Sequence, residues 1–106
     1  LNINHMSKIE QVKINLNVED LFRYKLVRER DGLSNVGHKA GWIEWNEDGT
    51  FKELHDEAAV GRSLILDPQR ISYTWMTTTV TEILEQKENY IKFATTNSIY
   101  ELWQNE

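Results

Sequence analysis

A chain of 106 residues, 40% hydrophobic and 27% charged, is long enough for one folded domain and too short for two independent cores. Its net charge of −5 at pH 7 argues against binding to a nucleic-acid backbone, which requires clustered positive charge. The absence of cysteine from the sequence excludes disulfides and zinc–thiolate sites.

The N-terminus predicts a short foreign segment followed by the domain. The first methionine is Met6, and the His-Met pair that it forms with His5 is typical of a cloning site. We therefore expect residues 1–5 to be a cloning remnant and residues 6–106 to be a single β-rich domain. No secretory leader follows Met6, and no apolar run approaches the ~20 residues of a membrane helix. We expect a cytoplasmic protein without membrane contact.

The first third of the chain contains one clear strand pattern and one ambiguous segment. Apolar and polar residues alternate from Val12 to Val18, which predicts a half-buried strand. For the next segment we favour a short helical turn at residues 18–22, leading into a strand that ends at Asp31-Gly32. A helix over all of residues 18–30 is the alternative. Residues 33–41, with two glycines, are predicted to form a loop.

The middle of the chain predicts a β-hairpin and a further strand. Residues 41–46 and 50–55 flank the turn sequence Asn-Glu-Asp-Gly, in which Gly49 can adopt the positive φ that such a turn needs. Residues 62–66 form a short apolar strand that ends at Asp67-Pro68.

Period-two alternation continues through the last third of the chain. It predicts one strand that places Ile71, Tyr73 and Trp75 on one face, and then a three-stranded meander. The predicted strands are residues 70–76, 77–85, 90–95 and 99–103, with turns at 87–89 and 96–98. The predicted fold class is therefore mainly β: a small antiparallel barrel or rolled sheet of about seven strands, with a short N-terminal helical turn.

The closing meander carries a pattern that resembles known sequences. The residues of the pattern are Thr78, Val80, Glu82, Thr95, Asn97, Ser98, Tyr100 and Leu102. The pattern resembles the closing meander of small uncharacterised bacterial, bacteriophage and prophage proteins, and it covers the last quarter of the chain. The resemblance implies β structure and a phage or prophage origin, and it implies no activity.

The sequence contains no signature of catalysis or cofactor binding. It has neither a cysteine nor a Gly-x-Ser-x-Gly nucleophile motif, and Gly37 to Gly41 has neither Walker nor dinucleotide-binding spacing. We therefore expect no enzyme activity and no cofactor. Carboxylates at Glu44, Glu53 and Glu82 could approach one another inside a barrel, but we favour solvent-facing positions.

Two further binding chemistries receive little support from the sequence. The run His55-Asp56-Glu57 offers metal-ligand types, but adjacent residues point away from each other, so we expect no metal site. The basic residues divide between two strand faces and are diluted by acidic neighbours, so nucleic-acid binding is an alternative that we do not favour. This basic group comprises Arg23, Lys25, Arg28 and Arg30.

The tryptophans suggest a binding surface. Trp42 and Trp45 are three residues apart on one predicted strand, so they face opposite sides of the sheet, and one of them lies outside the core unless a bulge intervenes. Exposed aromatic side chains are typical of binding surfaces. We therefore predict a non-catalytic interaction protein that contacts a protein partner or a second copy of itself. The expected contact residues are Trp42, Trp45, Arg62 and Arg70.

A small-ligand carrier is the alternative function. In that case the barrel would be lined by aromatic side chains and would enclose an apolar or nucleotide-sized molecule. The predicted lining residues are Tyr73, Trp75, Phe93 and Tyr100.

Overall fold

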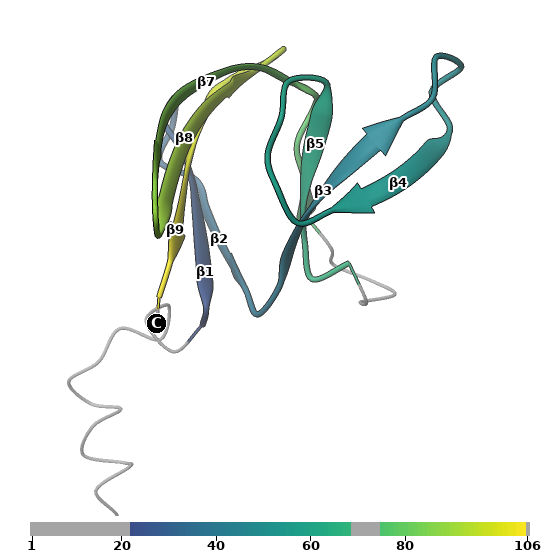
Figure 1. The fold of residues 1–106 in the computed structure, drawn as a ribbon. Coiled ribbons are helices and arrows are strands. Elements are labelled where there is room, and N and C mark those ends of the chain that lie inside the picture. Colours follow the sequence, from purple (N-terminus) through teal and green to yellow (C-terminus); the bar gives the residue numbers. More distant parts are fainter. Residues whose placement is uncertain (1–21, 69–74, 106) are drawn as a thin grey trace, which may run out of the picture.

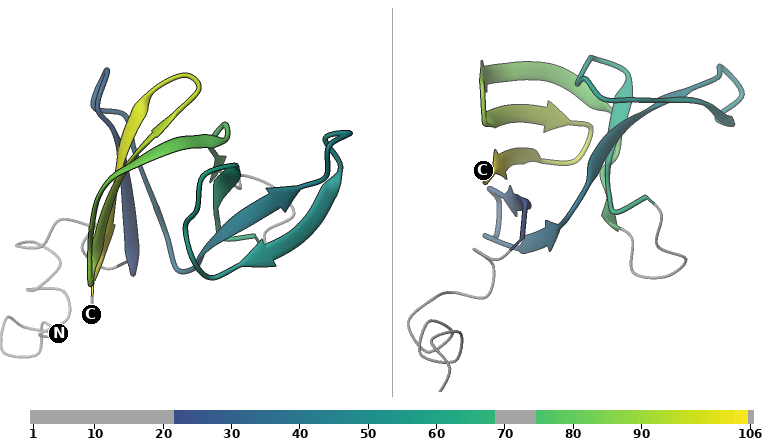
Figure 2. Two further views of the ribbon diagram at one scale, coloured as in Figure 1. Left: turned by 45° about the horizontal axis from the view of Figure 1, so that its top comes forward. Right: turned by 60° about the horizontal axis from the view of Figure 1, so that its bottom comes forward.

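The computed structural model describes residues 22–68 and 75–105, which form nine antiparallel strands in two sheets (Figure 1). The strands are β1 (Tyr24–Arg28), β2 (Ser34–Gly37), β3 (Ala40–Trp45), β4 (Phe51–His55), β5 (Arg62–Leu66), β6 (Trp75–Met76), β7 (Val80–Lys87), β8 (Tyr90–Thr95) and β9 (Ile99–Gln104). One sheet has the strand order β2-β1-β9-β8-β7, and the other has the order β4-β3-β5-β6. The chain passes from the first sheet to the second between β2 and β3, and the β3–β4 hairpin extends away from the five-stranded sheet (Figure 2).

The mainly β fold class is confirmed, but the closed barrel is wrong for the described part of the chain. Strand pairing does not continue from one sheet to the other. Gly61, the residue before β5, donates its backbone N–H to Val80 O of β7 (2.8 Å) and so links the two sheets. The hydrogen bond from Thr77 N to Leu64 O (2.9 Å) extends the β5–β6 pairing by one residue within the four-stranded sheet. The described residues contain no helix. The predicted strand at residues 12–18, and residues 18–21 of the predicted helical turn, lie outside the described residues.

The strand interpretation of the ambiguous segment is confirmed, and the helix alternative is wrong for residues 24–28. β1 pairs with β9, with Leu26 opposite Leu102, and Leu26 is only 1% exposed. Pairing with a strand about 75 residues further along the chain decides the conformation here, which local helical spacing could not reveal.

The loop predicted at residues 33–41 is also wrong, because it contains β2 and the beginning of β3. β2 pairs with β1 through the backbone, with Val36 opposite Lys25. The two glycines of this segment allow close approach of other side chains. A Cβ on Gly37 would lie 3.0 Å from Asp67 Oδ2, and one on Gly41 would lie 2.8 Å from Leu54 Cδ1.

The predicted β3–β4 hairpin is confirmed. Asn46 N donates to Thr50 O, and Gly49 N donates to Asn46 O, with Gly49 at a φ of 85°. The pairing shifts by one residue beyond the turn, since Trp45 lies opposite Phe51 but Glu44 lies opposite Glu53. Lys52 is therefore the extra residue of a β-bulge on β4.

The later strands mostly follow the sequence-based prediction. The strand at 62–66 is β5, and the closing meander is β7, β8 and β9. β7 begins at Val80 rather than at residue 77, because Thr77 instead donates its backbone N–H to Leu64 of the other sheet. Of the predicted strand 70–76, only β6 falls within the described residues.

The core lies between the two sheets. Phe93 and Tyr100 of the five-stranded sheet are 0% and 4% exposed, and their rings stack with centroids 5.5 Å apart. Trp42 of the four-stranded sheet meets the ring of Phe93 edge-on at 5.2 Å. Leu64 and Leu66 of β5 complete the same cluster. The inner face of the four-stranded sheet is thus the one that carries Trp42, Leu64 and Leu66. In the described residues, no helix is long and apolar enough to cross a membrane.

Candidate functional site

The two tryptophans of β3 lie on opposite faces of the four-stranded sheet. Trp42 is 4% exposed and belongs to the core. Trp45 lies on the other face, where its indole Nε1 donates a hydrogen bond to Ser63 Oγ at 2.9 Å. Trp45 is half-buried, and the hydrogen bond fixes the orientation of its ring.

The face that carries Trp45 is apolar across all four strands. Residues directly opposite each other in an antiparallel pair point to the same side, so the register identifies the members of this face. Ile43 lies opposite Leu54 and Ser63, Trp45 lies opposite Phe51, and Ile65 lies opposite Met76. We call this the outer face, and its strand residues are Gly41, Ile43, Trp45, Phe51, Leu54, Ser63, Ile65 and Met76.

Three large apolar side chains on the outer face are exposed. Phe51, Leu54 and Met76 are 57%, 45% and 49% exposed, and Ile43 among them is buried. None of the described strand residues on this face is ionisable. Isolated exposed apolar side chains are ordinary, but several on one sheet face together with a half-buried tryptophan are typical of a contact surface.

The edge of this sheet is less suited to contact than its face. β4 is an edge strand whose bulge at Lys52 interrupts the ladder, and a bulge with a lysine is a common protection against pairing with another strand. The bulge also brings Phe51 and Leu54 to the same side of the sheet, although they are three residues apart. It therefore discourages pairing at the edge and enlarges the apolar face.

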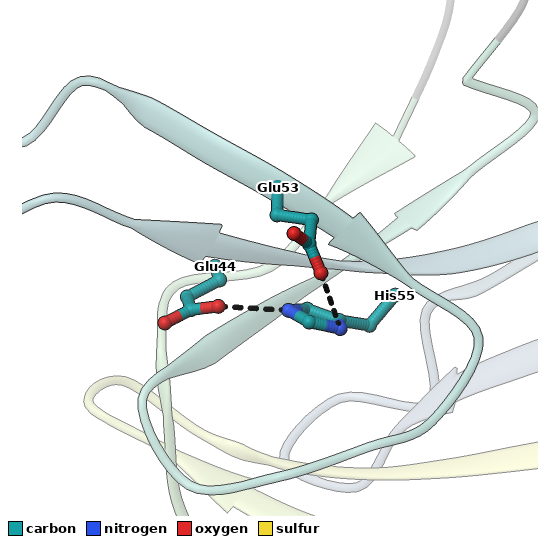
Figure 3. A group of neighbouring side chains, drawn as sticks. All are labelled: Glu44, Glu53 and His55. Carbon is teal, nitrogen blue, oxygen red and sulfur yellow. Dashed lines mark hydrogen bonds and ion pairs between the residues drawn. The ribbon is translucent and has the colours of Figure 1, made fainter.

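On the inner side of the same hairpin, a histidine lies between two carboxylates (Figure 3). His55 Nε2 is 2.8 Å from Glu44 Oε1, and His55 Nδ1 is 3.3 Å from Glu53 Oε2. Lys52 Nζ is 3.3 Å from Glu44 Oε2. The hydrogen bonds from His55 and then from Lys52 hold the pKa of Glu44 below its usual value.

This group differs from the combinations expected from the sequence. Glu44 and Glu53 do approach each other, as cross-strand neighbours, whereas Glu82 lies on β7 opposite Ala94. His55 meets these two glutamates rather than the adjacent Asp56 and Glu57. Three ligand atoms, one from each of Glu44, Glu53 and His55, lie within 4.8 Å of one another.

The remaining predicted contact residues are scattered. Arg62 donates from Nη1 to the backbone oxygen of Glu57 at 2.6 Å and so ties down the loop before β5. Arg70 lies outside the described residues, and so does Tyr73. The structure thus groups only Trp45 of the four predicted contact residues with the outer face, and their role in binding remains a prediction.

The aromatic residues predicted to line a ligand cavity pack against one another instead. Phe93 stacks on Tyr100, and Trp75 meets Tyr100 edge-on at 5.8 Å. Two clefts occur in the described residues: one of about 170 Å³ with Trp42 and Tyr90 among its lining, and one of about 330 Å³ beside His38 and Lys39. Neither is lined by Trp75, Phe93 or Tyr100.

The basic residues of β1 and the following turn are partly neutralised. Arg28 forms a two-point contact with Asp31, with Nε 3.0 Å from Oδ1 and Nη2 2.7 Å from Oδ2. The guanidinium and the backbone N–H of Leu33 hold the pKa of Asp31 far below its usual value. Lys92 lies 3.4 Å from Glu29 on the same sheet. Of the basic group, Arg28 is thus paired within its own turn, and the expectation against nucleic-acid binding remains a prediction.

No family model, curated protein or solved structure matches the chain. The resemblance of the closing meander to bacterial and bacteriophage proteins therefore remains a prediction, as does the phage or prophage origin that it implies.

Proposed function

We propose that this protein is a non-catalytic interaction protein that binds a second copy of itself through the outer face of the four-stranded sheet. The observation that carries this proposal is the exposure of Phe51, Leu54 and Met76 on the sheet face that also carries the half-buried Trp45. Burial of such a face away from water is favourable, and the same face of a second copy offers apolar surface of the same kind.

Charge favours a second copy as the partner. The chain carries a net charge of −5, so most surfaces of two copies repel each other weakly. The outer face has no ionisable group among its described strand residues, so no like charges meet when two such faces pack together. Sheets pack face to face in this way in β-sandwiches, with their strands at about 30° to each other.

The expected affinity is modest. Burying a large apolar side chain completely contributes about 1.5–3 kcal/mol, and each of the three exposed side chains is already about half buried. Association also loses translational, rotational and side-chain freedom. We therefore expect a weak dimer, with a dissociation constant on the order of hundreds of micromolar.

Sedimentation equilibrium of matched variants tests the proposal. The double variant Phe51→Ser/Leu54→Ser removes apolar area from the outer face and is expected to weaken dimerisation at least tenfold. The control variant Leu84→Ser alters a residue that is 41% exposed on β7, and it is expected to dimerise like the wild type. A wild type that remains monomeric at 0.5 mM would contradict the proposal, and so would equal weakening by both variants.

A further inference from the structure

We propose that Glu44, Glu53 and His55 form a binding site for a divalent transition-metal ion, with Zn²⁺ as the ion that matches these ligands best. Imidazole nitrogen and carboxylate oxygen are common zinc ligands, and a site with three protein ligands leaves a fourth position for water. The site lies on the opposite face of the hairpin from the proposed dimer contact, so the two proposals are independent.

The spacing of the ligand atoms suits a metal of this size. One atom from each residue lies within 4.8 Å of the other two (Figure 3). Ligand atoms of a tetrahedral zinc site, at about 2.0–2.2 Å from the ion, are roughly 3.3–3.6 Å apart. Small side-chain rotations therefore suffice to close the group around an ion.

Backbone pairing holds the three residues in place. Glu44 and Glu53 are directly opposite each other, and His55 follows two residues later on the same face as Glu53. β3 is also paired with β5 on its other side, so Glu44 stands on an interior strand. Glu53 is 62% exposed at its side chain, whereas that of His55 is 22% exposed, which leaves a path for the ion from solvent to the ring.

The charges of the group favour a cation. Two glutamates directly opposite each other in a sheet repel, and a positive charge between them removes that repulsion. A neutral imidazole donates only one N–H, so it satisfies one of the two carboxylates that face its nitrogens. A metal bound to one ring nitrogen and to the carboxylates balances both negative charges.

Two cationic side chains lie near this group, and one of them competes with a metal ion for Glu44. Lys52 Nζ lies 3.3 Å from Glu44 Oε2 and competes with a metal ion for that carboxylate. Arg62, opposite Glu44 on β5, instead donates to the backbone oxygen of Glu57. Lys52 is thus the cation whose removal should favour an ion at Glu44.

Isothermal titration of the full chain with ZnCl₂ at pH 7.5 tests the site. We expect one ion per chain, and we expect His55→Gln and Glu44→Gln each to weaken binding at least tenfold. The matched controls His38→Gln and Glu82→Gln alter the same residue types elsewhere and should bind like the wild type. Absence of zinc binding below 1 mM, or equal loss in His38→Gln, would overturn the proposal.

A second variant separates a metal site from a charge cluster. Lys52→Gln removes the competing cation, so a metal site predicts zinc binding several-fold tighter than in the wild type. Zinc affinity that is unchanged or lower in Lys52→Gln would overturn the proposal.

Imidazole ¹⁵N resonances of the wild type provide a measurement that needs no variant at the site. Zinc should shift the resonances of His55 and leave those of His38 in place. The reverse pattern would place the ion elsewhere and would also overturn it.

Discussion

The indole of Trp45 is held by Ser63 on the adjacent strand, with its Nε1 2.9 Å from the serine Oγ. Ser63 is only 2% exposed, although it lies on the outer face, and the indole provides part of its cover. The tryptophan is therefore a fixed part of the apolar face and not a freely rotating side chain. A fixed aromatic ring loses little conformational entropy when a partner covers it.

Replacing Ser63 with alanine should destabilise the domain by about 1 kcal/mol, the usual loss for one hydrogen bond whose donor regains partial access to water. Urea unfolding measures this loss. Thr81→Ala is the control, because the Thr81 hydroxyl makes a long, exposed contact of 3.3 Å. A loss for Thr81→Ala as large as that for Ser63→Ala would contradict the role given to this bond.

Phe93→Ala should be the more damaging of two phenylalanine substitutions. Phe93 is 0% exposed and lies between Trp42 and Tyr100, so truncation leaves a cavity and costs about 3–5 kcal/mol. Phe51→Ala removes a ring that is 57% exposed and should cost the monomer less than about 1 kcal/mol. Unfolding at concentrations below the dimer dissociation constant measures both losses. Similar values for the two variants would contradict the assignment of the core.

The β3–β4 turn should depend on the positive φ of Gly49. Alanine at a φ of 85° is strained by about 1–2 kcal/mol, while asparagine tolerates this region better. No other heavy atom lies within 4 Å of a Cβ built on Gly49, so strain of the backbone is the only expected cost. Gly49→Ala should therefore unfold at lower urea concentration than Gly49→Asn. The opposite order would refute this explanation.

The contribution of Asp31 to stability should disappear in acid. Its pKa is lowered in the folded protein, first by the hydrogen bond from Arg28. The stabilisation is therefore fully present above the ordinary aspartate pKa of 3.8, and it is lost as the pH falls through the folded-state value. The difference in melting temperature between the wild type and Asp31→Asn should be small, since the pair is exposed, and should shrink from pH 6 to pH 2. A difference that grows in acid would contradict the pairing.

Much of the fold follows from patterns that the sequence displays. The Asn-Glu-Asp-Gly turn locates the β3–β4 hairpin, and period-two alternation locates β8 and β9. β2 was missed because backbone pairing to β1 forms it, and its residues Ser34 to Gly37 show no apolar alternation. The separation into two sheets was missed because it depends on strand pairing over long sequence separations, such as that of β1 with β9, which alternation does not reveal.

The two candidate surfaces depend on a feature that the sequence does not display. Trp45 lies opposite Phe51. If the strands continued from this pair without a bulge, Lys52 would lie opposite Glu44 and Glu53 would lie opposite Ile43. The extra residue at Lys52 instead moves Glu53 to the face of Glu44. A single inserted residue thus separates the carboxylates from the apolar face, and alternation alone predicts neither group.

Isotope-filtered nuclear Overhauser spectra of a mixture of labelled and unlabelled chains locate the dimer contact without any substitution. We expect intermolecular contacts between the methyl groups of Leu54, Ile65 and Met76 in one copy and the rings of Trp45 and Phe51 in the other. Intermolecular contacts confined to another surface, such as Leu84 on β7, would contradict the proposed dimer. A concentrated sample without any intermolecular contact would contradict it equally.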